Sequence, residues 1–86
     1  MSEEVIAFTL GALQEMNFDT DGADARTVLG PAGIDLDSLA VAELALRLED
    51  KYGIKFAPED MEVVTVKTLG QLASDVATRA SRPVAR

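Results

Sequence analysis

The spacing of apolar residues most limits what this 86-residue chain can fold into. In three segments the apolar positions recur at steps of three and four residues, the period of a helix with one buried face. They are 3–17 with Ile6, Leu10, Leu13 and Met16; 37–52 with Leu39, Val41, Leu44, Leu48 and Tyr52; and about 67–80 with Leu69, Leu72, Val76 and Ala80. We therefore predict three amphipathic helices.

A short fourth helix is predicted to begin at Pro58. Proline suits the first helical position, and the two acidic residues that follow it suit the first turn. The valines at 63, 64 and 66 favour a strand by composition, but the chain offers this strand no partner. The sequence thus predicts an all-α four-helix bundle with a short third helix.

The first two long helices are separated by a long loop, residues 17–37, rich in Asp, Gly and Pro. Loops longer than roughly 12–15 residues are commonly functional or disordered. This one contains apolar anchors, so we expect it to pack across the helices, with a short turn near 25–28. The anchors are Phe18, Val28, Leu29, Ile34 and Leu36. Residues 1–80 are predicted to form one domain and residues 81–86, which include Pro83, a flexible tail.

The composition excludes several kinds of chemistry. Without Cys or His, the chain has no disulfide, no thiolate and no imidazole base to activate a serine. Residues 1–62 hold 14 acidic against 4 basic side chains. This charge disfavours nucleic acid and favours a partner with a basic surface. We therefore expect any chemistry to come from another protein.

The chain is also expected to be cytoplasmic and monomeric. No apolar run approaches the roughly 20 residues that cross a bilayer, and the N-terminus is acidic where a secretory signal would be basic. No leftover heptad seam indicates a coiled-coil partner. A membrane role is therefore not expected.

Ser38 is the residue most open to a chemical role. In one interpretation Asp37 or Ser38 is simply the N-cap of the helix that follows. In the other, Ser38 accepts a phosphate-linked group, which the N-terminal end of that helix would favour. Since the chain supplies no evident base for its hydroxyl, Ser38 would be the substrate of another enzyme, not a catalyst.

Several motifs together resemble the acyl carrier proteins over nearly the whole chain. They are Leu36-Asp37-Ser38-Leu39, Glu43-Leu44, Leu48-Glu49-Asp50-Lys51-Tyr52-Gly53-Ile54, Pro58-Glu59-Asp60 and Thr65-Val66. The resemblance implies a helical bundle of acyl-carrier type. It also implies that a phosphopantetheinyl transferase attaches 4'-phosphopantetheine from coenzyme A to Ser38. It also implies a non-enzymatic carrier that holds acyl groups as thioesters and moves them between biosynthetic enzymes.

The resemblance assigns the partner surface to the second helix. The matching positions are Asp37, Leu39, Glu43, Leu46, Glu49 and Asp50. Acyl-loading enzymes, ketosynthases or other enzymes would meet them with basic residues. In an alternative interpretation, the acidic positions form a solvated helix face, with Glu43 and Arg47 as an i,i+4 pair, and Leu39 and Leu46 pack in the core.

Cargo and pathway stay open. Ala40 and Asp35 depart from the commonest fatty-acid pattern, which favours polyketide or other specialised biosynthesis over primary fatty-acid synthesis. A peptidyl carrier of nonribosomal synthesis is an alternative, although Asp35-Leu36-Asp37 replaces its usual Gly-Gly-His before the serine. Outside carriers, the alternative is an acidic helical adaptor with an unmodified Ser38. An acyl cleft could be lined by Ile54, Phe56, Met61 and Val64.

Overall fold

The protein is described by a computed structural model in which residues 2–81 are placed. It contains α1 (Ser2–Glu15), α2 (Ser38–Tyr52), α3 (Pro58–Glu62), a 3-10 helix (Val64–Val66) and α4 (Leu69–Ser81). The all-α fold, the long loop between α1 and α2 and the short third helix are all confirmed. Of the predicted tail, residues 82–86 lie outside the described residues.

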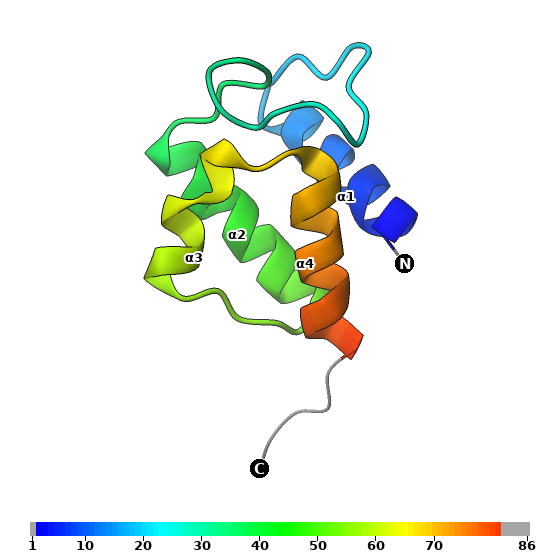
Figure 1. Cartoon of the computed structure of the whole chain (residues 1–86), viewed down its shortest axis with the longest axis vertical. Helices are drawn as coiled ribbons and strands as arrows, with labels where there is room; N and C mark the ends of the chain where they lie inside the picture. Colours follow the sequence, from blue (N-terminus) through cyan, green and yellow to red (C-terminus); the bar gives the residue numbers. More distant parts are fainter. Residues whose placement is uncertain (1, 82–86) are drawn as a thin grey trace.

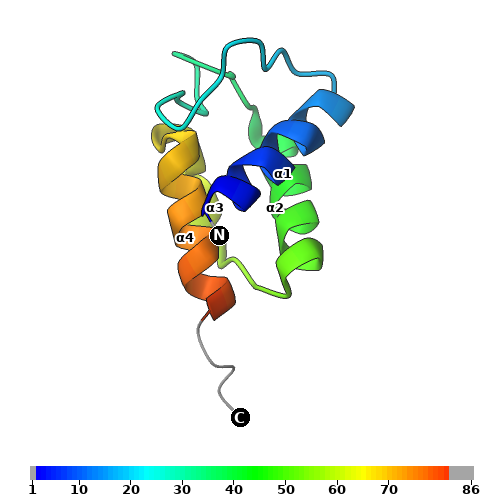
Figure 2. The same cartoon turned by 90° about the vertical axis from the view of Figure 1, so that its right-hand side faces the viewer.

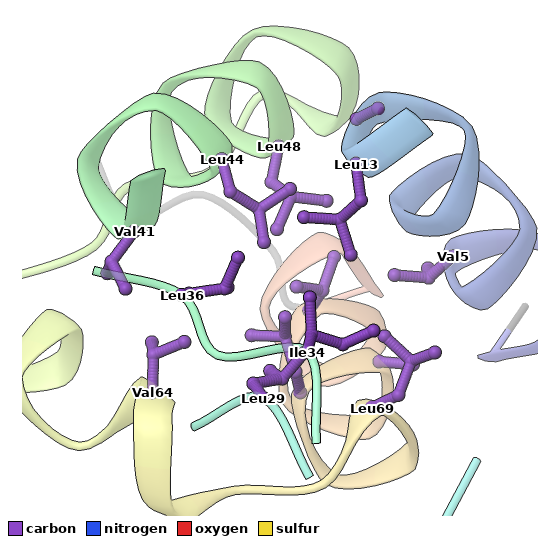
Figure 3. Packing of buried hydrophobic residues seen from close by; sticks show 14 of the residues in the cluster. Val5, Leu13, Leu29, Ile34, Leu36, Val41, Leu44, Leu48, Val64 and Leu69 are labelled. Atoms are coloured by element: carbon purple, nitrogen blue, oxygen red, sulfur yellow. The ribbon is translucent and has the colours of Figure 1, made fainter. Parts of the chain in front are cut away.

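The long helices pack around one core. Figure 1 shows α2 with α3 on one side and α4 on the other, and the long loop across one end of the bundle. Figure 2 shows α1 lying across α2 and α4. Buried side chains from α1, α2, α4 and the long loop meet in the core (Figure 3). No helix within residues 2–81 is both long enough and apolar enough to span a membrane.

The ends of α2 follow from local chemistry. Asp37 is its N-cap: its Oδ1 accepts the backbone N–H of Ala40 at 2.8 Å. Gly53 ends the helix in the left-handed conformation, with φ of 66°, and its N–H donates to the carbonyl of Glu49. Both boundaries lie where the sequence predicts them because each depends on a residue suited to its position.

The first helix differs from the prediction in its end and in its buried face. It ends at Glu15 and not at residue 17, because Asn17 adopts a left-handed conformation with φ of 72°. Leu13 is buried as predicted, but Ile6, Leu10 and Met16 are only partly buried. The other buried residues of α1 are Val5, Thr9 and Ala12. Because α1 lies across two helices, its buried face is broader than one apolar stripe.

Thr9 shows how a polar residue fits into that face. Its side chain is buried, and its hydroxyl donates to the carbonyl oxygen of Val5 at 2.7 Å. A buried hydroxyl that has a hydrogen-bond partner avoids most of the cost of leaving water. Thr9 can therefore face the core where hydrophobicity alone would not place it.

On α2, the prediction that Leu39 faces the core is wrong. Its side chain is 79% exposed, whereas Val41, Leu44 and Leu48 are buried. Leu39 lies two residues before Val41, which is a rotation of about 200° around the helix. It therefore points away from the face that Val41 gives to the core. Leu46, which lies off the same stripe, is 62% exposed.

The long loop is packed down, as its apolar anchors suggest. Leu29, Ile34 and Leu36 are buried. The loop backbone also forms hydrogen bonds with the segment around the start of α4. The N–H of Leu29 donates to the carbonyl oxygen of Lys67, and the N–H of Leu69 donates to the carbonyl oxygen of Thr27. An isolated antiparallel bridge joins residues 28 and 68. The expected turn lies at residues 24–27, where the N–H of Thr27 donates to the carbonyl of Asp24.

Candidate functional site

Ser38 and Asp37 have separate roles at the start of α2. The Asp37 carboxylate caps the helix through Ala40, and its carbonyl accepts the N–H of Val41 at 2.9 Å. Ser38 is the first residue of α2 and is exposed. Its hydroxyl forms no hydrogen bond with any described residue. The cap therefore does not use Ser38, and its oxygen is available to another molecule.

A groove of about 590 Å³ opens beside Ser38. This volume lies in the range typical of small-molecule sites, roughly 300–1,000 Å³. The groove lies between the start of α2, α3, the 3-10 helix and the end of the long loop. Its lining residues are Pro31, Leu36, Asp37, Ser38, Val41, Pro58, Met61, Glu62 and Thr65. A flexible group attached to the Ser38 hydroxyl could therefore lie along this groove.

An apolar cavity lies deeper, between α2, α4 and the link to α3. It measures about 10 Å³, which is room for about one water molecule. Its lining residues are Val41, Leu44, Ala45, Leu48, Phe56, Val64 and Leu72. Val41 lines both the cavity and the groove, so the two spaces are neighbours.

The four predicted cleft residues occupy different places. Phe56 and Val64 line the apolar cavity, and Met61 lines the groove beside Ser38. Ile54 is buried in the core and lines neither space. The structure thus brings three of the four residues to the walls of two adjoining spaces and places the fourth in the hydrophobic core.

The predicted partner residues all lie on α2 or at its cap, but their surroundings differ. Leu39, Leu46 and Asp50 are exposed. The Glu43 carboxylate accepts a hydrogen bond from Nε of Arg47 at 3.0 Å. Half-buried Glu49 accepts the backbone N–H of Phe56 at 2.8 Å, so its carboxylate fastens the link between α2 and α3.

Arg79 is a residue of this region that the sequence analysis did not single out. Its guanidinium pairs with Asp75 at 3.0 Å and Asp60 at 3.1 Å, and donates to the carbonyl of Lys55 at 3.0 Å. It also lies 5.0 Å from the centre of the Phe56 ring. The only local signal is the i,i+4 spacing of Asp75 and Arg79, because the other contacts come from distant segments.

Asp60 links α3 to this arrangement. Its carboxylate accepts the N–H of Ala57 at 2.9 Å, which caps α3. This hydrogen bond, together with the nearby Arg79, lowers the pKa of the Asp60 carboxyl below its ordinary value, although partial burial opposes the shift. Within residues 2–81, no group of three or more acidic side chains is placed to hold a metal ion.

Comparison with known proteins identifies the same region. The family described as "Phosphopantetheine attachment site" matches residues 32–76, just over half of the chain. This segment contains Ser38, α2, α3 and the first part of α4. The match thus covers Ser38 and the residues of α2 and α3 that line the groove.

Curated relatives match about half of this chain. The "Acyl carrier protein" of Rhodococcus erythropolis is 39% identical over 41 residues, which are 48% of this chain and 43% of that protein. The "Meromycolate extension acyl carrier protein" of Mycolicibacterium smegmatis is also 39% identical over 41 residues, 39% of its length. The matched region thus spans less than half the length of either relative. No solved structure matches the chain.

The family's group is 4'-phosphopantetheine, and the site has the features needed to hold it. Ser38 presents an exposed hydroxyl with no hydrogen bond to a described residue, beside a groove about 590 Å³ in volume. The attachment family matches across this site, and the relatives are acyl carrier proteins. The chain therefore belongs to the phosphopantetheine-attachment family, whose members carry a covalently attached 4'-phosphopantetheine, and it is similar to acyl carrier proteins.

Proposed function

We propose that this chain is an acyl carrier protein whose Ser38 holds 4'-phosphopantetheine and that it shuttles acyl intermediates between enzymes of polyketide or other specialised biosynthesis. The observation that carries this proposal is the exposed Ser38 hydroxyl, which opens onto a groove and is not used by the helix cap. When bound, the arm supplies the thiol on which an acyl group is held as a thioester.

Attachment requires Ser38 to react with coenzyme A in the active site of a transferase. The serine oxygen bonds to the phosphorus that bears pantetheine, the diphosphate bond of coenzyme A breaks, and adenosine bisphosphate leaves. Because this chain has no His, a base of the transferase takes the hydroxyl proton. The resulting phosphodiester lies at the start of α2, where backbone N–H groups and the helix dipole favour an anion.

The two neighbouring spaces suggest how the chain handles cargo. The groove beside Ser38 receives the arm along Val41 and Met61. The apolar cavity, with Phe56 and Val64 in its wall, measures only about 10 Å³ and is too small for an acyl chain. In this proposal the cavity widens when α3 and the link before it move away from α2 and α4, and Ile54 supports this wall from the core.

Partner enzymes are proposed to approach the exposed side of α2. Asp37, Leu39 and Leu46 lie on this side beside Ser38 and along the helix, and Asp50 lies near its end. Glu43 and Glu49 complete the acidic set predicted from the sequence. A phosphopantetheinyl transferase, acyl-loading enzymes and ketosynthases with basic docking surfaces suit this combination of carboxylates and apolar side chains.

A second candidate is a carrier for fatty-acyl chain extension. The relatives' names favour it, because they are acyl carrier proteins and several are named for meromycolate extension. The same names favour acyl over aminoacyl cargo. The departures at Asp35 and Ala40 are the reason for retaining specialised biosynthesis as the first candidate.

The test is the intact mass of the full chain after incubation with coenzyme A and a promiscuous phosphopantetheinyl transferase. We expect one added phosphopantetheine on the wild type and none on Ser38→Ala. Ser74→Ala is the matched control, since Ser74 is an exposed serine in α4, and it should be modified like the wild type. Circular dichroism checks that each variant is helical.

Two results would contradict the proposal. If a folded wild-type chain gains no mass with several transferases, the acidic adaptor becomes the better interpretation. If Ser38→Ala still gains one phosphopantetheine, the arm is attached elsewhere.

A further inference from the structure

Arg47 joins two helices on the proposed partner surface. Its Nη1 lies 2.7 Å from Oε1 of Glu15 in α1, and its Nε lies 3.0 Å from Oε2 of Glu43 in α2. The Arg47 side chain is only 32% exposed, whereas the two carboxylate side chains are 73% and 50% exposed. These contacts raise the pKa of Arg47 above its ordinary value, so it stays charged.

The position of Arg47 on α2 places these two ion pairs among the acidic residues of the proposed partner surface. Residues three and four apart are neighbours on a helix surface. Arg47 therefore has Glu43 on one side and Asp50 on the other, and exposed Leu46 lies next to it in the sequence. Its guanidinium pairs with Glu43 and with Glu15, which is distant in the sequence, and not with Asp50.

The result is an uneven distribution of available charge along α2. Glu43 has a cation within hydrogen-bond distance, and half-buried Glu49 is engaged with the backbone of Phe56. Asp50 is exposed and has no ion-pair partner among the described residues. A basic group that approaches Glu43 therefore meets a carboxylate already paired with Arg47, whereas one that approaches Asp50 meets a carboxylate with no ion-pair partner among the described residues.

We propose that Arg47 is a specificity-determining residue that screens Glu43 from basic partner enzymes. The inference rests on the proposed carrier function. The partner that fits this surface has a basic group opposite Asp50, apolar contacts for Leu39 and Leu46, and a neutral or acidic group opposite Arg47. An enzyme with a continuous basic docking face is disfavoured by Arg47.

The first test compares transferase efficiency for two variants with the same net charge. The probe is a phosphopantetheinyl transferase with a basic docking face, and kcat/KM for loading Ser38 is measured at low and high salt. Arg47→Met should raise kcat/KM roughly threefold or more at low salt, with a smaller gain at high salt. Arg26→Met, which removes an exposed cation from the long loop, should have little effect.

The second test separates screening from a merely structural role. If Arg47 screens Glu43, then the factor by which Glu43→Gln lowers kcat/KM should be roughly threefold or more larger in the Arg47→Met background than in the wild type. Arg47→Lys retains the charge but lacks the two separate nitrogens that contact Glu15 and Glu43. It should therefore give an intermediate gain in kcat/KM. It also provides a folded comparison if the methionine variant proves unstable.

The outcomes distinguish this inference from the function on which it rests. Equal gains for Arg26→Met and Arg47→Met, or equal losses from Glu43→Gln in both backgrounds, would overturn the screening role while leaving Ser38 loading intact. No loading of any variant, the wild type included, would overturn the carrier function and the inference together.

Discussion

At the scale of single residues, Asp37 and Ser38 show how the helix cap and the proposed attachment site fall on two adjacent polar side chains. Both residue types are good N-caps, so the sequence leaves open which one caps α2. In the structure the Asp37 carboxylate takes the Ala40 N–H. The cap is thus satisfied by Asp37 and not by Ser38, so the proposed loading of Ser38 need not remove a hydrogen bond from the helix.

Leu39 and Leu48 allow the stability effects of substituting an exposed and a buried leucine to be compared on the same helix. Leu48→Ala should lower the free energy of unfolding by about 2–5 kcal/mol, because the side chain is only 1% exposed. Leu39→Ala should change it by less than about 0.5 kcal/mol, since that side chain is 79% exposed. Urea unfolding followed by circular dichroism measures both.

The same Leu39 variant should load more slowly when kcat/KM is measured with the transferase. A loss of loading without a loss of stability places Leu39 on the partner surface. A destabilisation close to that of Leu48→Ala would instead show that Leu39 packs in the core in solution.

At the scale of the elements, local chemistry accounts for what could be predicted. Asp37 and Gly53 set the bounds of α2, and the periodicity of its apolar residues sets its type. The buried face of α1 could not be predicted as well, since it depends on α1 crossing two helices. The groove also lies beyond local rules, because Pro31, Ser38 and Thr65 meet only after the loop has packed.

Gly30 is the point where the long loop comes closest to the 3-10 helix. A Cβ at this position would overlap the carbonyl oxygen of Thr65, which is backbone and cannot rotate away. We expect Gly30→Ala to lower the free energy of unfolding by about 1–3 kcal/mol, as overpacking does. It should also slow Ser38 loading, because the neighbouring Pro31 and Thr65 line the groove.

Gly11 offers the matched control for this prediction. It is exposed within α1, and a Cβ there meets no atom within 4 Å. Gly11→Ala should stabilise the chain by about 0.5–1 kcal/mol through helix propensity. Thermal and urea unfolding of the two variants should therefore shift in opposite directions. Similar shifts would show that the loop does not pack tightly on the 3-10 helix.

In the whole molecule, two kinds of contact hold the helices together. Helices α1, α2 and α4 share the buried apolar core, whereas α3 has no buried residue of its own. Polar contacts to α4 hold α3 and its link, through Arg79 with Asp60 and the carbonyl of Lys55. The position of α3 and its link thus depends strongly on ionisable groups, whereas α1, α2 and α4 are held together mainly by their shared apolar core.

This difference predicts that α3 loosens in acid before the core unfolds. The pKa of Asp60 is lowered in the folded protein, chiefly by the Ala57 N–H and also by Arg79, from an ordinary value of 3.8. Its contribution to stability is therefore complete above that value and is lost as the pH falls through the lower folded pKa. In hydrogen exchange measured at decreasing pH and corrected for the intrinsic exchange rate, residues 54–62 should lose protection before α1, α2 and α4.

Asp60→Asn should reproduce this loosening at neutral pH, because the amide keeps the size of the side chain but removes its charge. Hydrogen exchange measured by mass spectrometry should become faster over residues 54–62 and stay unchanged in α2. Glu59→Gln is the control, since Glu59 is exposed and forms no ion pair within residues 2–81. Equal exchange in the two variants would mean that apolar contacts, and not the Asp60 carboxylate, hold α3 and its link in place.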